Sequence, residues 1–356
     1  MKLYAKVDVL EGELPTPLVG GGAGIARRSF AVLTLTRDDG TSGVGEASPL
    51  PGYSPDDLDD SAAALHALVD RPLVVDALAS PFEIVSSVFE QYPLVEPSAR
   101  FALETAVLDW LGRNRGLPVH QVVGGDSERR PIPISDLVLA SDPLAWVGEI
   151  ERLIADGASH LKFKVGGDFE SEVRALEEIR ARHPEIPIRL DGNRKVEVTE
   201  LNARADALEA LGLEMFEEPV RQEDFVRALE LPLPWALDET LLDIDGAMRL
   251  LETEKIRCVV LKPTVLGGFR ASLEIAERAA EFGAEATVSH TFDGPIARAA
   301  TAELALVLQC PRAVGLGMHP ALDLWPPCDT AAIDGRRIVE HHEFGLGLSF
   351  EEAPDA

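Results

Sequence analysis

Two lysines lie two residues apart in the short apolar stretch HLKFKVGG, residues 160–167. If this stretch is a strand, Lys162 and Lys164 point to the same face of it, because side chains alternate along a strand. The next four short apolar stretches also end in polar side chains. These are Asp191 and Asn193, then Glu217 and Glu218, then Asp238 and Glu239, and finally Lys262. Five successive stretches thus end in the order lysine, acid, acid, acid, lysine.

The three acidic stretches predict a metal site. Crowded carboxylates repel one another unless a cation lies between them, and an all-oxygen ligand set is typical of Mg²⁺ rather than of zinc. We therefore expect one Mg²⁺, replaceable by Mn²⁺, bound by Asp191, Glu217 and Asp238. The lysines of the first and last stretches would then face each other across the metal.

The two flanking lysines indicate proton transfer. A lysine acts as a base only if its pKa falls towards neutrality, and desolvation, a neighbouring ammonium and a divalent cation all lower it. Lys162 would do this for Lys164. The reaction that such a set serves is abstraction of a proton α to a carboxylate, with the metal stabilising the enediolate. Each residue alone could be a solvated charge or a helix N-terminal acid, but their order along the chain favours a catalytic site.

The elements that would position these residues begin near residue 131. Eight short β-like stretches alternate with amphipathic helical stretches: PIPISDLV, HLKFKV, IPIRLDGN, EMFEEPV, WALDET, CVVLKPT, EATVSH and RAVGLG. Their spacing of roughly 20 to 30 residues suits one β/α unit each, and such units close a parallel barrel whose site lies at the carboxyl ends of the strands. An open doubly wound sheet would need a glycine-rich phosphate turn, which VGGDFESE at 165–172 matches poorly. The fold class expected is α/β, a (β/α)7β TIM-like barrel.

The first part of the chain predicts a separate α+β unit. SFAVLTLTRDDGTSGVGEA, residues 29–47, indicates a hairpin with a DDG turn, and residues 98–119 indicate a helix that stops at Gly116 and Pro118. The segments 17–24 and 48–57 are rich in glycine or proline and indicate loops. We expect an α+β capping domain at 1–118, the barrel at 119–324, and a C-terminal segment at 325–356 that returns to the capping domain. Within that segment, IDGRRIVE indicates a short hairpin.

Composition excludes several classes of partner. The chain has 356 residues, more than the roughly 250 to 300 of a single core, and a net charge of −28, which opposes nucleic-acid binding. It has no apolar stretch of the length that a membrane span needs, and no secretory leader pattern. Its three widely separated cysteines support neither a disulfide framework nor a thiolate zinc site. We expect a cytoplasmic enzyme acting on a small carboxylate; the oligomeric state is not predicted.

The motifs KFK, DGN, FEEP, LDET and LKPT follow one another along residues 162–264. In this order and spacing the chain resembles the enolase superfamily, specifically its muconate-lactonizing-enzyme subgroup. GVGEASPLPGYS at 43–54 is similar to a capping-domain loop of that subgroup, and residues 102–125 are similar to its entry into the barrel. The resemblance therefore covers nearly the whole chain.

This resemblance implies a role for each site residue. Lys164 would take the α-proton and return it to a departing hydroxyl, while Lys262 would stay protonated as a cation–π partner of the substrate. The first acid of FEEP and of LDET would be the metal ligand. Lys162, Asn193 and Glu239 would support the ligands, and Ser289, Gly315 and Gly317, with the two capping-domain loops, would contact the substrate.

Within the subgroup, GEASPLPGYS and LKPTVLGG most resemble the o-succinylbenzoate synthases. N-acylamino-acid racemases, dipeptide epimerases and muconate-type cycloisomerases share the scaffold and remain alternatives. Dipeptide epimerases usually carry an Asp-x-Asp at the eighth strand, where this chain has GLGMHPALD at 315–323. A non-catalytic homologue is disfavoured, because no expected ligand or lysine is missing.

Overall fold

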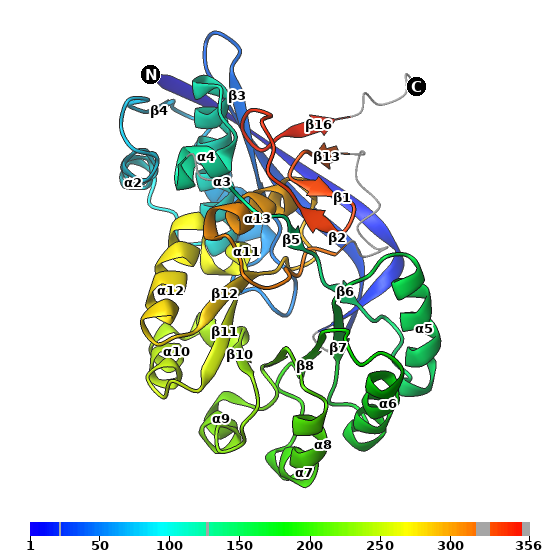
Figure 1. The fold of residues 1–356 in the computed structure, drawn as a ribbon. Helices are drawn as coiled ribbons and strands as arrows, with labels where there is room; N and C mark the ends of the chain where they lie inside the picture. Colours follow the sequence, from blue (N-terminus) through cyan, green and yellow to red (C-terminus); the bar gives the residue numbers. More distant parts are fainter. Residues whose placement is uncertain (21–22, 126–127, 318–327, 351–356) are drawn as a thin grey trace.

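The computed structural model describes residues 1–20, 23–125, 128–317 and 328–350. Figure 1 shows an antiparallel sheet with its helices next to a curled parallel sheet that is surrounded by helices. This arrangement confirms the predicted TIM-like barrel with an α+β capping region. In the described part of the chain, no helix is long and apolar enough to cross a membrane.

The antiparallel sheet has the strand order β3-β2-β1-β4. Its strands are β1 (Lys2–Gly20), β2 (Ala23–Thr36), β3 (Ser42–Ala47) and β4 (Leu73–Val74). The predicted hairpin is present as β2 and β3, where Leu33 pairs with Gly45. The expected loop at 17–24 is wrong for its described residues, because β1 and β2 extend into it from both sides and Gly20 pairs with Ala23. Backbone groups pair in an antiparallel ladder whatever the side chain, so this segment needs no apolar alternation to form strands.

Helices cover this sheet and join it to the barrel. They are α1 (Leu58–His66), α2 (Pro81–Gln91), α3 (Pro97–Arg115) and α4 (Val119–Gly124). Helix α3 packs against β2, β3 and the barrel helix α11 (Pro263–Leu266), and it is therefore buried on most of its surface. A Cβ atom at Gly45 would lie 1.9 Å from the carbonyl oxygen of Ala102, so β3 and α3 can approach this closely only at a glycine. The helix ends before Gly116, as predicted, and Gly116 has a φ of 67°.

The barrel contains a parallel sheet in the order β12-β11-β10-β9-β8-β7-β6. Its strands are β6 (Asp136–Leu137), β7 (Leu161–Lys164), β8 (Ile188–Asp191), β9 (Met215–Glu217), β10 (Trp235–Leu237), β11 (Ile256–Leu261) and β12 (Glu285–Val288). The eighth predicted stretch closes the ring through parallel bridges, from Val314 to Ile134 and from Gly315 to Ser289. All eight predicted stretches thus take part in the barrel.

Helices between the strands form the outer layer. They are α5 (Pro143–Ala155), α6 (Phe169–Arg182), α7 (Val198–Ala203), α8 (Ala205–Ala210), α9 (Phe225–Ala228), α10 (Ile244–Leu251), α12 (Phe269–Glu281) and α13 (Pro295–Leu308), with short 3-10 turns η1 (Gln222–Asp224) and η2 (Glu239–Leu242). Phe163 of β7 packs outward against Trp146 of α5, with ring centroids 5.0 Å apart. The apolar face of β7 therefore meets the helices, and Lys162 and Lys164 lie on the opposite face.

The interior of the barrel is filled at the amino-terminal ends of the strands. Arg189 of β8 donates to both carboxylate oxygens of Glu214, at 2.7 and 3.0 Å, and to the carbonyl oxygen of Ala313 at 2.7 Å. Met215, Cys258 and other apolar side chains form a small cluster of their own inside the barrel. A site for a ligand is therefore expected at the opposite, carboxyl-terminal end.

The C-terminal segment packs back on the helices. It contains β13 (Cys328–Thr330), β14 (Ile333–Asp334), β15 (Arg337–Ile338) and β16 (Leu348–Phe350), and β14 and β15 form the predicted hairpin. Strand β15 pairs with β5 (Ile132–Pro133), and the backbone of Leu346 donates to Asp109 of α3 at 2.8 Å. The domain limits at residues 118 and 324 stay predictions, and residue 324 lies outside the described residues.

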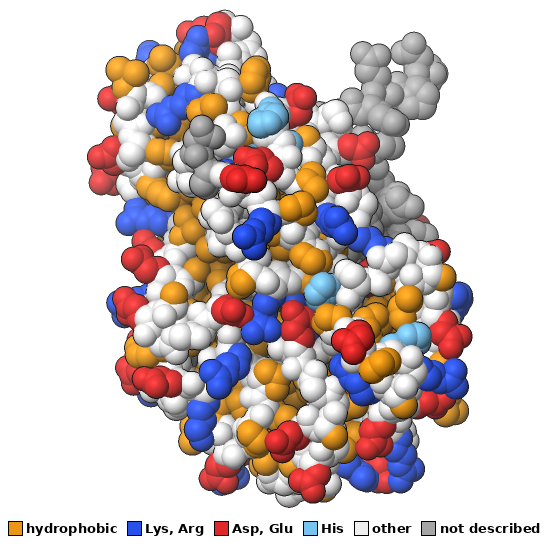
Figure 2. Space-filling model, viewed as in Figure 1, with side chains coloured by type: hydrophobic (Ala, Val, Ile, Leu, Met, Phe, Trp, Pro, Cys, Tyr) orange, Lys and Arg blue, Asp and Glu red, His pale blue; other side chains and the backbone are white. Residues whose placement is uncertain are grey.

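Acidic and basic side chains are interspersed over the face of the molecule that Figure 2 shows.

The cysteines Cys258, Cys310 and Cys328 are all free, in line with the expectation of no disulfide framework.

Candidate active site

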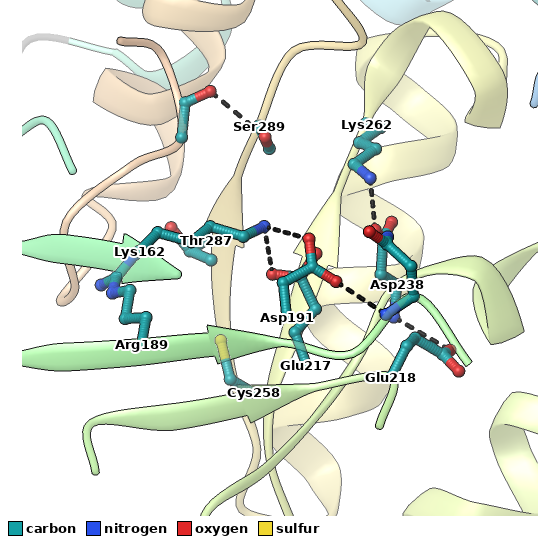
Figure 3. Close-up of polar contacts among 12 residues, drawn as sticks. Lys162, Arg189, Asp191, Glu217, Glu218, Asp238, Cys258, Lys262, Thr287 and Ser289 are labelled. Carbon is teal, nitrogen blue, oxygen red and sulfur yellow. Dashed lines mark hydrogen bonds and ion pairs between the residues drawn. The ribbon is translucent and has the colours of Figure 1, made fainter. Parts of the chain in front are cut away.

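The predicted site residues converge at the carboxyl ends of β7 to β11. Lys164 is the register partner of Asp191, and Asp191 is the partner of Glu217 on the next strand. Figure 3 shows Lys162 and Lys262 approaching a group of carboxylates from different sides. The sequence motifs are therefore brought together as expected, because parallel strands end at the same edge of the barrel.

The three predicted metal ligands are crowded and buried. Asp191, Glu217 and Asp238 are 2%, 1% and 4% exposed. Burial and the neighbouring charge of Asp191 raise the pKa of Glu217 to about 8. The Oε1 atom of Glu217 is buried and has no hydrogen-bond partner among the described residues. An orphaned carboxylate oxygen within three converging carboxylates fits the donor set of a hard divalent cation.

Lys162 lies between two of these carboxylates. Its Nζ is 2.9 Å from Oδ2 of Asp191 and 2.7 Å from Oε2 of Glu217. Burial alone would lower the pKa of Lys162, but Asp191 and Glu217 outweigh it, and the net effect raises the pKa. Burial alone would likewise raise the pKa of Asp191, yet the lysines Lys162, Lys164 and Lys262 hold it below its usual value. Lys162 therefore carries a charge that offsets the repulsion between the ligands.

Lys262 is held tightly on the other side of the site. It is 8% exposed, its Nζ forms an ion pair with Asp238, and it donates to Oη of Tyr53 at 2.8 Å. Burial alone would lower the pKa of Lys262, but Asp238 and Tyr53 outweigh this and raise it well above its usual value. These contacts agree with the expectation that Lys262 remains protonated.

Lys164 differs from the other two lysines. Its side chain is exposed, and within the described residues it has no hydrogen bond or ion pair. Desolvation of its ammonium lowers its pKa, Asp191 opposes this, and Lys162 and Lys262 lower the pKa further. The net effect is a pKa of Lys164 below the ordinary value of a lysine. Lys164 thus combines access with a weakened hold on its proton, which is what a general base needs.

Two of the predicted supporting residues contact each other, and one of them contacts a predicted metal ligand. Nδ2 of Asn193 donates to Oε1 of Glu239 at 3.0 Å, and the backbone of Asn193 donates to Asp191 at 3.1 Å.

The second acid of FEEP has a role that the sequence analysis did not assign. Buried Glu218 accepts hydrogen bonds from the backbones of Asp238, at 3.2 Å, and Thr240, at 2.6 Å. Glu218 therefore fixes the end of β10 and with it the orientation of Asp238.

Tyr53 is a second residue that the sequence analysis did not single out. It comes from the 48–57 segment, which forms no helix or strand. Its Oη donates to Oδ1 of Asp238 at 3.0 Å, and Nζ of Lys262 lies 4.6 Å from the centre of its ring. The motif PLPGYS indicated a binding loop, but only the packing of the loop over the barrel shows which of its side chains reaches the site.

Three predicted substrate contacts lie near the ends of the seventh and eighth barrel stretches. Ser289 is bridged to Gly315, and its Oγ donates to the Gly315 carbonyl oxygen at 3.2 Å. A Cβ atom at Gly315 would lie 2.4 Å from that Oγ, so this close approach requires a glycine. Gly317 approaches the carbonyl oxygen of Ser135, which a Cβ atom would meet at 3.1 Å. Their contact with a substrate stays a prediction.

Comparisons with known proteins agree with this geometry. The mandelate racemase / muconate lactonizing enzyme N-terminal domain family matches residues 5–124, and the enolase C-terminal domain-like family matches residues 145–353. The o-succinylbenzoate synthase of Geobacillus stearothermophilus is 28% identical over 304 residues, covering 83% of this chain and 79% of that protein. The L-Ala-D/L-Glu epimerase of Bacillus subtilis (strain 168) is 27% identical over 284 residues, covering 77% of this chain and 76% of that protein.

A solved structure shows the same fold over almost the whole chain. A dipeptide epimerase from Methylococcus capsulatus, complexed with Mg and the dipeptide L-Arg-D-Lys, has a TM-score of 0.82 at 24% identity and covers 98% of this chain and 100% of its own. Both family matches and the fold lead to the same conclusion: this chain belongs to the enolase superfamily.

Proposed function

We propose that this chain is an o-succinylbenzoate synthase, a cytoplasmic lyase of menaquinone biosynthesis. It would dehydrate 2-succinyl-6-hydroxy-2,4-cyclohexadiene-1-carboxylate to o-succinylbenzoate with syn geometry. The observation that carries this proposal is the unequal state of Lys164 and Lys262. Lys164 is exposed and unpaired within the described residues, whereas Lys262 is buried and held by Asp238 and Tyr53. One exposed, unpaired base and one cation held by partners suit a reaction that uses a single acid–base group.

The mechanism assigns both proton transfers to Lys164. As the free amine it accepts the α-proton of the substrate carboxylate, which leaves an enediolate. As the ammonium it then donates that proton to the hydroxyl that departs as water, and the ring becomes aromatic. Because the same nitrogen removes and returns the proton, both events take place on one face of the ring.

The remaining residues stabilise charge and hold geometry. Asp191, Glu217 and Asp238 would hold the Mg²⁺ that their donor set fits. When bound, this cation would supply electrostatic stabilisation of the negative charge that develops as the α-proton leaves. Lys262 would face the ring of the substrate as a cation, held in place by its partner Asp238.

The second candidate is an isomerase that racemises N-acylamino acids or epimerises dipeptides. It is favoured by the similarity to the L-Ala-D/L-Glu epimerase, which is almost as high as that to the synthase. Such a reaction needs a second acid–base group on the opposite face of the α-carbon, and Lys262 would have to serve. The Asp-x-Asp pattern expected of dipeptide epimerases is missing from residues 315–323, most of which lie outside the described residues.

The two candidates are separated by assaying both substrates with Mg²⁺. Dehydration is monitored through the loss of the diene's ultraviolet absorbance. Racemisation is monitored through exchange of the α-proton of an N-succinylamino acid in D₂O. Efficient dehydration that fails without metal and in Lys164→Ala supports the synthase. Exchange without dehydration would reject it in favour of the isomerase.

Lys262→Arg sharpens this test. Arginine keeps the positive charge but does not lose its proton at accessible pH. A synthase should keep measurable dehydration in this variant, because Lys262 contributes only its charge. A two-base isomerase should lose turnover in it to the same extent as in Lys164→Ala. The exposed Lys195 is the matched control, and Lys195→Ala should leave both reactions unchanged.

A further inference from the structure

Three side chains of metal-binding type meet outside the barrel site. His120 lies in α4, Glu303 in α13, and His341 between β15 and β16. His120 and Glu303 are fully buried, and His341 is 7% exposed. One ligand atom from each residue lies within 4.8 Å of the other two. Positions that are far apart in the chain thus place two imidazoles and one carboxylate around a common point.

The contacts within this cluster leave ring nitrogens unused. One oxygen of Glu303 is 2.9 Å from Nδ1 of His120, and the other is 2.5 Å from Nε2 of His341. Nε2 of His120 and Nδ1 of His341 are buried without a hydrogen-bond partner among the described residues. Buried polar atoms are nearly always satisfied, so an unpartnered nitrogen on each of the two rings is unusual. An ion at the common point would be bound by Nδ1 of His120, Nε2 of His341 and Glu303, in place of their present contacts, and the unused nitrogens would lie on the outer side of the rings.

Glu303 carries the negative charge of this cluster, and it also accepts a hydrogen bond from the backbone of His120 at 2.6 Å. The only ion-pair partners of the buried Glu303 carboxylate, within the described residues, are the two histidines. The nearby guanidinium of Arg129 donates instead to the carbonyl oxygen of His120 at 3.2 Å, and it is paired with Glu340 at 3.6 Å. Removing a carboxylate from water is costly unless a positive charge accompanies it. A divalent ion bound by the rings would supply that charge.

We propose that His120, Glu303 and His341 form a second metal site, for a zinc-like transition-metal ion bound by both imidazoles, with Glu303 as the carboxylate of the site. Imidazole with carboxylate is a ligand set typical of Zn²⁺ or Co²⁺, whereas Mg²⁺ prefers oxygen ligands alone. The site is separate from the Asp191, Glu217 and Asp238 carboxylates, and it does not depend on the reaction proposed above. The ion would be structural, because it ties α4, α13 and the C-terminal segment together.

The first test uses the full-length wild-type protein. The metal-stripped protein is loaded with two equivalents of Zn²⁺, one for each site, and its zinc X-ray absorption spectrum is recorded. Imidazole scattering is the expected result, because the barrel carboxylates provide only oxygen ligands. A spectrum with oxygen ligands alone would overturn the proposal, and this test requires no variant to fold.

The second test assigns the imidazoles. Zn²⁺ affinity is measured by competition with a chromophoric chelator, in the presence of excess Mg²⁺. His341→Gln and Glu303→Gln should each weaken zinc binding by about 10-fold or more, because each removes one side chain of the site. The neighbouring His342 is exposed and lies outside the cluster, so His342→Gln is the matched control. Unchanged zinc binding in folded His341→Gln protein, or equal loss in His342→Gln, would contradict the assignment.

Discussion

Lys164 differs from the site lysines Lys162 and Lys262 in having no ion pair within the described residues and an exposed side chain. We expect Lys164→Ala to lower turnover by about 10²- to 10⁴-fold, the usual contribution of a positioned general base. Because the side chain is exposed, the melting temperature should stay close to that of the wild type. Steady-state rates and thermal melts check both statements, with Lys195→Ala as control. Wild-type turnover in Lys164→Ala would remove the assignment of the base.

The pH dependence of the rate should report the same lysine. Only neutral Lys164 accepts a proton, so activity is lost as pH falls through its pKa. Desolvation and then the neighbouring lysines Lys162 and Lys262 set this pKa below the ordinary value, against the opposing effect of Asp191. We therefore expect kcat/KM to rise with pH and to level off below about 10.4, the usual pKa of a lysine. A profile that still rises through that value would show that Lys164 is not shifted in the working enzyme.

Tyr53 connects the 48–57 segment to the catalytic groups through its hydroxyl. In Tyr53→Phe the ring stays beneath Lys262, but the hydrogen bonds with Asp238 and Lys262 are lost. Hydrogen bonds to charged groups contribute about 1.5 to 3 kcal/mol, so kcat should fall by roughly 10-fold or more. Measurement of kcat and KM tests this, with the exposed Tyr4 replaced by phenylalanine as control. An unchanged kcat would mean that the hydroxyl does not help to position Lys262.

At the scale of elements, one buried carboxylate joins the capping helix α3 to the barrel. Glu104 accepts hydrogen bonds from the backbone of Phe269, at 2.6 Å, and of Arg270, at 3.2 Å, where α12 begins. Burial raises the pKa of Glu104 to about 7. Between the ordinary pKa and this value, the folded protein holds a proton that the unfolded chain releases. The contribution of Glu104 to stability is therefore present at low pH and is lost as pH rises through about 7.

Glu104→Gln removes this titration and allows the effect to be isolated. The quantity to compare is the free energy of unfolding of the variant minus that of the wild type. This difference should increase by about 3 kcal/mol between pH 4.5 and pH 8, since one pKa unit corresponds to about 1.4 kcal/mol. Urea unfolding at a series of pH values measures the difference. The exposed Glu277→Gln in α12 should show no such trend. A difference that is constant with pH would show that Glu104 does not titrate in this range.

At the scale of the whole molecule, Mg²⁺ should stabilise the fold. Three buried carboxylates repel one another in the absence of a divalent ion, and a ligand that binds only the folded state adds about 2.7 kcal/mol at 100 times its dissociation constant. We expect a chelator to lower the melting temperature and to abolish activity, and Mg²⁺ to restore both. In Asp191→Asn the Mg²⁺-dependent shift should be much smaller, whereas the exposed Asp245→Asn should keep it. An equal shift in Asp191→Asn would place the ion elsewhere.

The barrel and its row of charged strand ends could be predicted because both depend on local patterns. Alternation along β7 sends Phe163 to the helices and Lys162 to the interior, and parallel strands bring Asp191 next to Glu217. These relations need only the period of a strand and the order of the motifs. The hairpin of β2 and β3 and the end of α3 at Gly116 were predictable for the same reason, since turn and cap residues act on their immediate neighbours.

Other features depend on how distant segments pack, and no local pattern encodes that. Tyr53 reaches Asp238 across 185 positions of the chain, and His120 meets Glu303 across 183. The role of Glu218 was not predicted, because only the backbone course after β10 directs its carboxylate to the amide of Thr240. The sequence by itself thus determined the barrel, the acids and the lysines at its mouth. The tertiary structure decided which lysine is free, which loop residue enters the site and where the buried histidines meet, because these depend on contacts between segments that the chain brings together only on folding.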